Sequence, residues 1–189
     1  MNVQNPAIKS PATYQDVLDA PANMVAELIR GTLHLQPRPR PKHSRAMTVL
    51  GSTIGGPFDF DDSGPGGWFI LIEPELHLGD DVLVPDIAGW RRERLPSLPD
   101  EVGITVAPDW VCEVLSPSTR TYDLTEKRDI YRECGVAHLW LVDPLARTLE
   151  AFALRDDAWA LIAALHDDAD VAVAPFDAVA FRLSALWSD

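Results

Sequence analysis

The segment from Trp110 to Val142 decides the fold of this chain. It opens with the apolar run Trp110-Val-Cys-Glu-Val-Leu115 and closes with a second run, His138-Leu-Trp-Leu-Val142. Short, nearly continuous apolar runs are typical of strands that are covered on both faces. Between the two runs, the residue pattern predicts a helix from about Asp123 to Cys134, with Gly135 as its C-cap. Because this strand–helix–strand order is that of a crossover unit, the two strands are predicted to be parallel.

The flanking segments predict the other elements of one mixed α/β domain. Toward the N-terminus we expect a short helix capped by Thr13 and then a hairpin over 25–35, with its turn at Arg30-Gly31. An extended Pro-rich connection over 36–42 should lead into a helix over 43–54, which Gly55-Gly56-Pro57 is expected to end. Two strands are predicted after it, over 68–78 and 82–90. Toward the C-terminus we expect a hairpin with strands over 149–154 and 159–164, and a tail over 179–187 that caps the sheet. The prediction is a single domain over 1–189, with its core at about 25–145 and the C-terminal strands and tail at 146–189.

The composition is that of a globular protein with a sizeable core. Of the 189 residues, 47% are hydrophobic and 24% are charged, which excludes disordered, collagen-like and coiled-coil classes. No apolar run approaches the roughly 18 residues of a spanning helix, so no membrane segment is predicted. Two cysteines are too few for a disulfide framework or a Cys-rich zinc site. Because residues 1–11 also lack the pattern of a signal peptide, we expect a cytoplasmic protein.

The net charge of −13 is concentrated in two stretches. Residues 56–81 carry seven acidic residues and no Lys or Arg, and residues 150–189 carry a net charge of −6. The rest of the chain has 14 acidic and 14 basic residues, and its basic residues include Arg38, Arg40, Lys42, Arg45, Arg91, Arg92 and Arg94. These groups could form a local basic face or could be scattered and solvated, and the overall acidity disfavours long-range attraction of a polyanion.

Three charged residues stand where the hydrophobic pattern predicts apolar ones. Glu113 lies inside the first apolar run, and Asp86 follows Pro85 inside a predicted strand. Lys127 lies on the apolar stripe of the predicted helix, three residues before Ile130. Bare burial of a charge costs several kcal/mol, so each of these groups must be neutralised, paired or bound to a cation.

Structural and functional explanations are both open for these three residues. Glu113 and Lys127 could form an ordinary buried ion pair, or Lys127 could reach water or pair with Asp123. Asp86 could simply accept backbone donors at a strand end. A shared function accounts for all three: two carboxylates on neighbouring strands can hold Mg²⁺, and a lysine beside them can orient or deprotonate a water and counter charge on a phosphate. Such a set is the equipment of a metal-dependent phosphodiesterase.

A wider combination of motifs accompanies these residues. It consists of Glu27-Leu-Ile-Arg-Gly31, His43, Val84-Pro-Asp86, Pro108-Asp-Trp-Val-Cys-Glu-Val-Leu-Ser-Pro-Ser-Thr119, Asp123, Lys127, Tyr131 and Gly135-Val-Ala-His-Leu-Trp-Leu-Val-Asp-Pro144. Together these motifs resemble the Uma family of putative restriction endonucleases, in the PD-(D/E)XK nuclease superfamily. The resemblance implies a restriction-endonuclease-like fold, in which helices flank a mixed β-sheet.

The resemblance also implies roles for the charged residues. Asp86 and Glu113 would be the metal ligands and catalytic acids, with Lys127 as the catalytic lysine. The superfamily lysine usually follows the glutamate by two residues, where this chain has Leu115, so the resemblance implies that the lysine has moved to the following helix. Glu27 would be an accessory catalytic acid near the metal, with a solvated hairpin charge as the alternative.

Three further residues are candidate substrate contacts. His43 and Arg45 could bind phosphate, although a surface histidine at a helix start is also consistent with the sequence. Ser116 could touch substrate or cap the helix. A second Pro-Asp pair, Pro108-Asp109, precedes Glu113 by only four residues and is not expected to supply a ligand.

The predicted function is that of an Mg²⁺-dependent endonuclease that hydrolyses DNA phosphodiester bonds, with Mn²⁺ as a substitute. RNA or a nucleotide is an alternative substrate, and a homodimer is inferred only from how such enzymes cut two strands. The alternative from a different class is a non-catalytic nuclease-fold protein that binds nucleic acid or a protein partner. Both the acidity of the chain and Leu115 in place of the usual lysine keep that alternative open.

Overall fold

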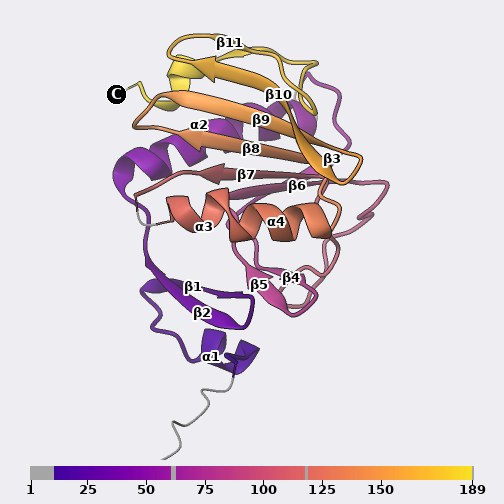
Figure 1. The fold of residues 1–189 in the computed structure, drawn as a ribbon. Coiled ribbons are helices and arrows are strands. Elements are labelled where there is room, and N and C mark those ends of the chain that lie inside the picture. The colour runs from indigo at the N-terminus through magenta and orange to yellow at the C-terminus, as the bar shows by residue number, and fades with distance from the viewer. Residues whose placement is uncertain (1–10, 61–62, 118, 189) are drawn as a thin grey trace, which may run out of the picture.

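The computed structural model describes residues 11–60, 63–117 and 119–188. At its centre lies a six-stranded sheet in the order β10-β9-β8-β7-β6-β3 (Figure 1). The strands of this sheet are β3 (Trp68–Ile72), β6 (Ile87–Arg91), β7 (Trp110–Val114), β8 (His138–Asp143), β9 (Thr148–Arg155) and β10 (Ala158–His166). β7 and β8 are parallel, and every other neighbouring pair is antiparallel. The predicted parallel pairing of the two apolar runs is therefore confirmed.

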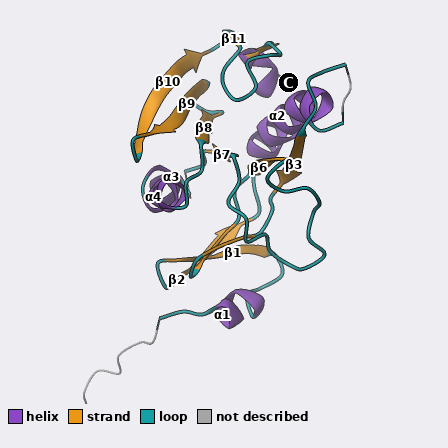
Figure 2. Cartoon of the chain, turned by 90° about the vertical axis from the view of Figure 1, so that its right-hand side faces the viewer, coloured by secondary structure: helices purple, strands orange, loops and turns teal. Residues whose placement is uncertain are grey.

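Helices cover both faces of this sheet (Figure 2). They are α2 (Pro41–Phe58) with the short helix η1 (Leu183–Leu186) on one face, and α3 (Arg120–Leu124) with α4 (Glu126–Glu133) on the other. Under α2, Leu50 and Leu183 share a core with Phe176, whose ring contacts three tryptophans. Under α4, Ile130 and Tyr131 are buried in a second core. The predicted class, a mixed β-sheet flanked by helices, is confirmed.

A second, smaller sheet lies below the first in Figure 1. Its strand order is β2-β1-β5-β4, and its strands are β1 (Met24–Ile29), β2 (Thr32–Pro37), β4 (Leu76–Leu78) and β5 (Asp81–Leu83). Arg30 and Gly31 form the β1–β2 turn with φ values of 50° and 73°, as the predicted hairpin requires. The short helix α1 (Tyr14–Leu18) begins after Thr13, whose backbone N–H donates to the Asp16 carboxylate at 2.7 Å. The predicted N-cap is therefore confirmed.

The two long strands predicted over 68–78 and 82–90 are wrong, because each is divided between the two sheets. β3 and β4 are separated at Glu73-Pro74, where Glu73 adopts a φ of 47°. β5 and β6 are separated at Pro85-Asp86. Proline has no N–H for a strand ladder, so each strand leaves its sheet at that point. The chain therefore passes from one sheet to the other at both breaks, and Asp86 lies where the two sheets meet.

Two predicted helices have different limits in the structure. α2 begins at Pro41, a favoured first position for proline, and continues through the Gly55-Gly56-Pro57 stop that was expected to end it. Pro57 lies in the last turn, where Asp59 N–H still donates to Gly55 O at 2.9 Å, so the helix survives the loss of one donor. The helix predicted over 123–134 begins at Arg120 and is broken at Thr125, between α3 and α4.

The C-terminal segments follow the prediction. β9 and β10 form the expected hairpin, with a register shift between Leu161 and Ala163. β11 (Asp170–Val171) and β12 (Phe181–Arg182) then lead into η1, where Leu186 is fully buried against the α2 core. Within the described residues, no helix is long and apolar enough to cross a membrane.

Candidate functional site

A cavity of about 840 Å³ lies at the carboxyl end of β7, where the two sheets meet. β1 and β2 supply one side, and the ends of β7 and β8 with α3 and α4 supply the other. Of the seven site residues predicted from the sequence, six line this cavity: Glu27, His43, Asp86, Glu113, Ser116 and Lys127. The fold therefore brings together side chains from five separated segments.

Asp86 is fixed between a backbone donor and a histidine. Its Oδ2 accepts the N–H of Val114 at 2.7 Å, which holds the carboxylate against β7, directly beside Glu113. Its Oδ1 lies 3.2 Å from His43 Nε2. Burial alone would lower the pKa of His43, but the hydrogen bond and charge of Asp86 outweigh it and raise the pKa above the ordinary value. The contact with Asp86 therefore favours the protonated form of His43.

Lys127 is the hub of a buried ion network. Its side chain is only 2% exposed, and its Nζ lies 2.8 Å from Glu113 Oε1 and 3.0 Å from Glu27 Oε1. Burial alone would lower the pKa of Lys127, but the charges of Glu113 and Glu27 outweigh it and hold the pKa well above the ordinary value. The predicted buried position of Lys127 on the core-facing stripe of the helix is thus realised, and its partners are carboxylates of two different sheets.

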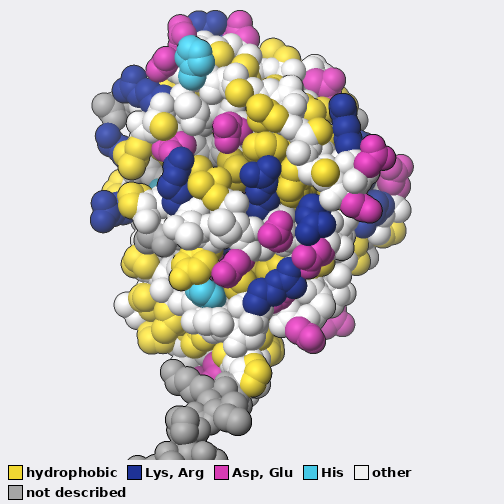
Figure 3. All heavy atoms as spheres, viewed as in Figure 1, with side chains coloured by type: hydrophobic (Ala, Val, Ile, Leu, Met, Phe, Trp, Pro, Cys, Tyr) yellow, Lys and Arg dark blue, Asp and Glu magenta, His cyan; other side chains and the backbone are white. Residues whose placement is uncertain are grey.

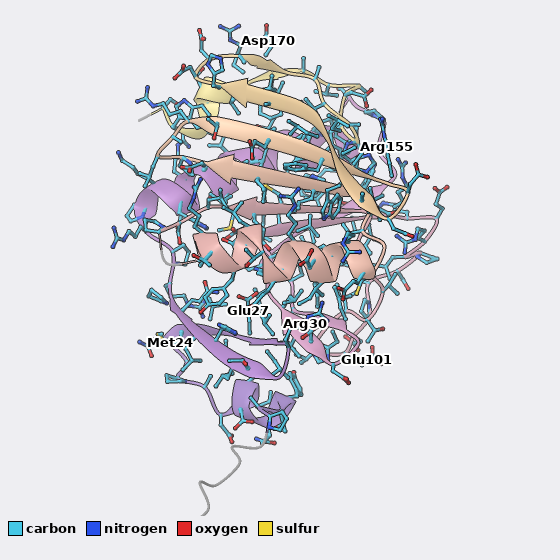
Figure 4. All side chains as sticks on the ribbon, viewed as in Figure 1. Met24, Glu27, Arg30, Glu101, Arg155 and Asp170 are labelled. Carbon is cyan, nitrogen blue, oxygen red and sulfur yellow. The ribbon has the colours of Figure 1, made fainter. Side chains whose placement is uncertain are left out.

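Glu27 approaches Lys127 from the small sheet. It stands on β1 and lies between that strand and the α3–α4 pair (Figure 4). Its Oε1 accepts the N–H of Val84 at 2.8 Å, and its Oε2 accepts Gln36 Nε2 at 2.8 Å. With its side chain 1% exposed, Glu27 is not the solvated hairpin charge that the sequence left as an alternative.

Glu113 is held by two donors on one oxygen. Tyr131 Oη donates to Glu113 Oε1 at 2.6 Å, and Lys127 contacts the same atom. Burial raises the pKa of Glu113 well above its ordinary value against the opposing charge of Lys127, and the neighbouring carboxylates of Asp123 and Asp86 raise it further. Both contacts use Oε1, so a cation that approached Oε2 from the cavity would displace neither of them.

Asp123 is a fourth carboxylate of the cavity. The sequence had offered it only as a partner of Lys127, and its Oδ1 lies 3.7 Å from Lys127 Nζ across the break between α3 and α4. Burial raises the pKa of Asp123 to about 6, although the charge of Lys127 opposes the shift. Among the described residues, Glu27, Asp86, Glu113 and Asp123 form ion pairs with only two side chains, Lys127 and His43.

This excess of buried negative charge matches the requirements of an added cation. Asp86 and Glu113 offer oxygen donors of the kind that Mg²⁺ prefers. Among the described residues, no group of three or more His, Cys, Asp or Glu side chains is arranged to hold a metal ion. Mg²⁺ commonly takes one or two protein carboxylates and completes its shell with water and phosphate, so the two-carboxylate set fits this ion.

The remaining predicted residues lie at the edge of the site or outside it. Ser116 Oγ lies 3.1 Å from Thr119 Oγ1 and accepts the Thr119 N–H at 3.3 Å, so it supports the start of α3 while lining the cavity. Arg45 is exposed on α2, outside the cavity lining, and its Nε donates to the backbone of Ser188 at 3.4 Å. Asp109 accepts the Arg91 N–H and an Arg94 guanidinium N–H, each at 2.9 Å, which accounts for this second Pro-Asp pair structurally.

Two positioning groups were not among the site residues predicted from the sequence. Tyr131 follows Lys127 by four residues on the same stripe, a signal that the resemblance motif also contained. Gln36 bonds Glu27 across the β1–β2 hairpin, and no sequence pattern distinguishes it from an ordinary polar strand residue.

The fold has a counterpart among solved structures. A crystal structure described as a putative nuclease belonging to DUF820 from Anabaena variabilis ATCC 29413 superposes with a TM-score of 0.75 and 24% sequence identity, covering 94% of this chain and 98% of that chain. Residues 11–184 match the family Uma2, described as "Putative restriction endonuclease". The chain therefore belongs to the Uma2 family, and the resemblance read from its motifs is confirmed. No curated protein matches the chain in sequence.

Proposed function

We propose that this chain is a metal-dependent endonuclease that hydrolyses DNA phosphodiester bonds in the cavity at the end of β7. One observation carries the proposal: Asp86, directly before β6, and Glu113, on the neighbouring strand β7, line one cavity, and the Lys127 ammonium lies 2.8 Å from Glu113. Membership of a family described as restriction endonucleases supports DNA as the substrate.

In this proposal Asp86 and Glu113 hold Mg²⁺, with Mn²⁺ as a substitute. When bound there, the ion would polarise a substrate phosphate and lower the pKa of a coordinated water. Lys127 stays protonated, because its pKa is raised, and it therefore counters charge on the phosphate and orients the water without acting as a base. Of the two roles that the sequence left open for the lysine, the proposal takes the one that needs a protonated side chain.

The other residues position this machinery. Glu27 fixes the Lys127 ammonium from the small sheet, and Tyr131 fixes the Glu113 carboxylate. His43 holds Asp86 and lies at the cavity wall, where its imidazole ring could also contact a phosphate oxygen. Ser116 lines the cavity beside Glu113, within reach of an entering strand.

The test is nicking of supercoiled plasmid by the purified chain with Mg²⁺, with Mn²⁺ and with EDTA. We expect relaxed circles to form only with a divalent ion, and we expect the same ions to raise the melting temperature, since a ligand that binds only the folded state stabilises it by mass action. If neither nicking nor a melting shift occurs, the proposal is wrong.

One observation favours the non-catalytic alternative. The network of Lys127 with Glu27 and Glu113 is already paired without a metal, which would suffice for a structural ion cluster in a nuclease-fold binding protein. That function is the conclusion if the chain binds nucleic acid but cuts none with either ion.

A further inference from the structure

We infer that the cavity receives a single-stranded stretch of DNA, so that the protein cuts single strands, overhangs and flaps in preference to intact duplex. The inference rests on the proposed function and adds to it the form of the substrate. Its basis is the depth of the reacting groups, the charge of the cavity edge and the nature of its walls.

Lys127 and the two carboxylates that pair with it lie in the deeply buried part of the cavity. The side chains of Lys127, Glu27 and Glu113 are 2%, 1% and 3% exposed, whereas Asp86 and His43 are 16% and 12% exposed. A phosphodiester must therefore enter the cavity to come within reach of Glu113 and Lys127. The phosphates of a regular duplex lie on the outside of a stiff rod, so a duplex must first unstack the nucleotides beside the scissile bond.

The edge of the cavity is basic although its floor is acidic. One wall is the connection Arg38-Pro-Arg-Pro-Lys42, which runs from the end of β2 into the first turn of α2. Arg38, Arg40 and Lys42 are exposed and form no ion pair with any other described residue. Figure 3 shows Lys and Arg side chains at the left edge of the molecule, at the level where α2 begins. Three cations in a row can follow the phosphates of a strand that enters the cavity.

The prolines of this connection also limit its movement. Pro39, and Pro41 at the first position of α2, restrict the backbone on either side of Arg40, so this wall of the cavity has little freedom to move aside. A flexible single strand can bend to follow such a wall, whereas a duplex is stiff over this length.

The remaining walls suit exposed bases. The cavity lining includes Val84, Leu115, Pro117, Pro144 and Leu145. Leu145 is 66% exposed, so its side chain is accessible to a ligand in the cavity. Unstacked bases offer apolar faces to such side chains, whereas bases within a duplex are stacked on one another.

The volume of the cavity agrees with this substrate. At about 840 Å³ it falls within the range of pockets that enclose a small ligand, roughly 300–1,000 Å³. A space of this size can hold a short stretch of nucleotides.

The test compares end-labelled substrates of one sequence with Mn²⁺: a DNA single strand, a blunt duplex, a duplex with a single-stranded flap, and an RNA single strand. We expect the DNA strand and the flap to be cut at least tenfold faster than the duplex, with flap cuts inside the unpaired part. A duplex that is cut as fast as the single strand overturns the inference. An RNA strand that is cut faster than the DNA strand overturns the assignment to DNA.

Binding is measured separately by fluorescence anisotropy of the single strand in EDTA. Replacing Arg38, Arg40 and Lys42 together by Gln is expected to weaken binding at least tenfold at low salt and to reduce the salt dependence by about two counterions, at roughly 0.7 per lost contact. The matched control is Arg155→Gln, at the β9–β10 turn on the opposite edge of the molecule (Figure 4), which should bind like the parent. Equal weakening by the control, or none by the triple variant, overturns the role of this connection.

The two proposals fail in different ways. If the protein binds the single strand but does not cut it with any divalent ion, the proposed catalysis is wrong, whereas the inference that the cavity receives a single strand still holds. Cutting of duplex and single strand at one rate refutes the form of the substrate and leaves catalysis intact. Absence of both binding and cutting refutes the two together.

Discussion

Lys127 is the residue on which the site depends most, because its ammonium is the counterion of both Glu113 and Glu27. We expect Lys127→Met to reduce plasmid nicking by orders of magnitude and, in EDTA at pH 8, to destabilise the fold by about 3–5 kcal/mol. Mn²⁺ should restore part of the lost melting temperature, because a cation bound by Asp86 and Glu113 neutralises one of the carboxylates that lost the ammonium, but it should not restore nicking. A variant that nicks as fast as the parent contradicts the catalytic role of Lys127.

Glu113 is expected to be a metal ligand, and its amide variant isolates this role. Glu113→Gln keeps the size of the side chain and an acceptor for Tyr131, so the fold should survive. The rise in melting temperature caused by Mg²⁺ or Mn²⁺ should disappear in this variant. Glu101→Gln, an exposed site outside the cavity lining, is the control that should keep the full rise. A metal-induced rise that persists in Glu113→Gln shows that Glu113 is not a ligand.

Asp123 makes the stability depend on pH. Burial raises its pKa to about 6 in the folded protein, against an ordinary value of 3.8. The folded state therefore binds a proton more tightly than the unfolded chain, so the contribution of Asp123 is fully present below about pH 4 and is lost as pH rises through 6.

The neutral analogue Asp123→Asn should remove this dependence. In EDTA at pH 8 we expect it to raise the melting temperature by about 2–4 °C, or on the order of 1 kcal/mol, with the gain shrinking toward pH 4. Differential scanning fluorimetry across this pH range measures the effect, and the exposed Asp100→Asn serves as control. A gain that is constant with pH would exclude titration of Asp123 as its cause.

At the scale of elements, alanine substitutions at two glycines distinguish the effect of close packing from the effect of helix propensity. A Cβ on Gly89 of β6 would lie 2.9 Å from Ile70 Cδ1 and 3.2 Å from a Trp110 ring carbon. Gly89→Ala should therefore destabilise the six-stranded sheet by about 1–3 kcal/mol. A Cβ on Gly55 of α2 would meet its nearest side-chain atom, on Phe60, at an ordinary 3.4 Å. Gly55→Ala should be neutral or stabilise by up to about 1 kcal/mol. Urea unfolding of both variants tests the contrast, which equal effects would contradict.

The elements that the sequence predicted best are those with a single environment along their length. β7 and β8 are apolar throughout because both of their faces are covered, and this pattern has one interpretation. The strands around Pro74 and Pro85 have an equally regular pattern, but it does not specify which of two sheets each half joins. The breaks at these prolines are decided by the packing of one sheet against the other.

The same distinction applies to the candidate site. Glu113 and Lys127 were predictable because each violates the apolar pattern around it, and a buried charge requires a partner. Tyr131 and Gln36 break no pattern, since a tyrosine suits a core and a glutamine suits a strand. Their roles depend on which carboxylate the fold brings next to them, and that is set by contacts between distant segments.

For the whole molecule, the prediction of a single domain has a calorimetric test. The two sheets share one cavity, and the Glu27–Lys127 ion pair joins them. We therefore expect one cooperative thermal transition, with equal calorimetric and van't Hoff enthalpies. Two separate transitions, with the small sheet melting first, would show that residues 11–37 and 76–83 form an independent unit.

The ion pair between Glu27 and Lys127 joins residues that are a hundred positions apart in the chain. During synthesis, Glu27 leaves the ribosome long before α4 exists, and contacts of such long range are late to form. A nascent chain, or one terminated before α4, therefore carries Glu27 without the Lys127 ammonium and lacks a complete site. The proposed cutting activity thus requires a chain that extends at least through α4.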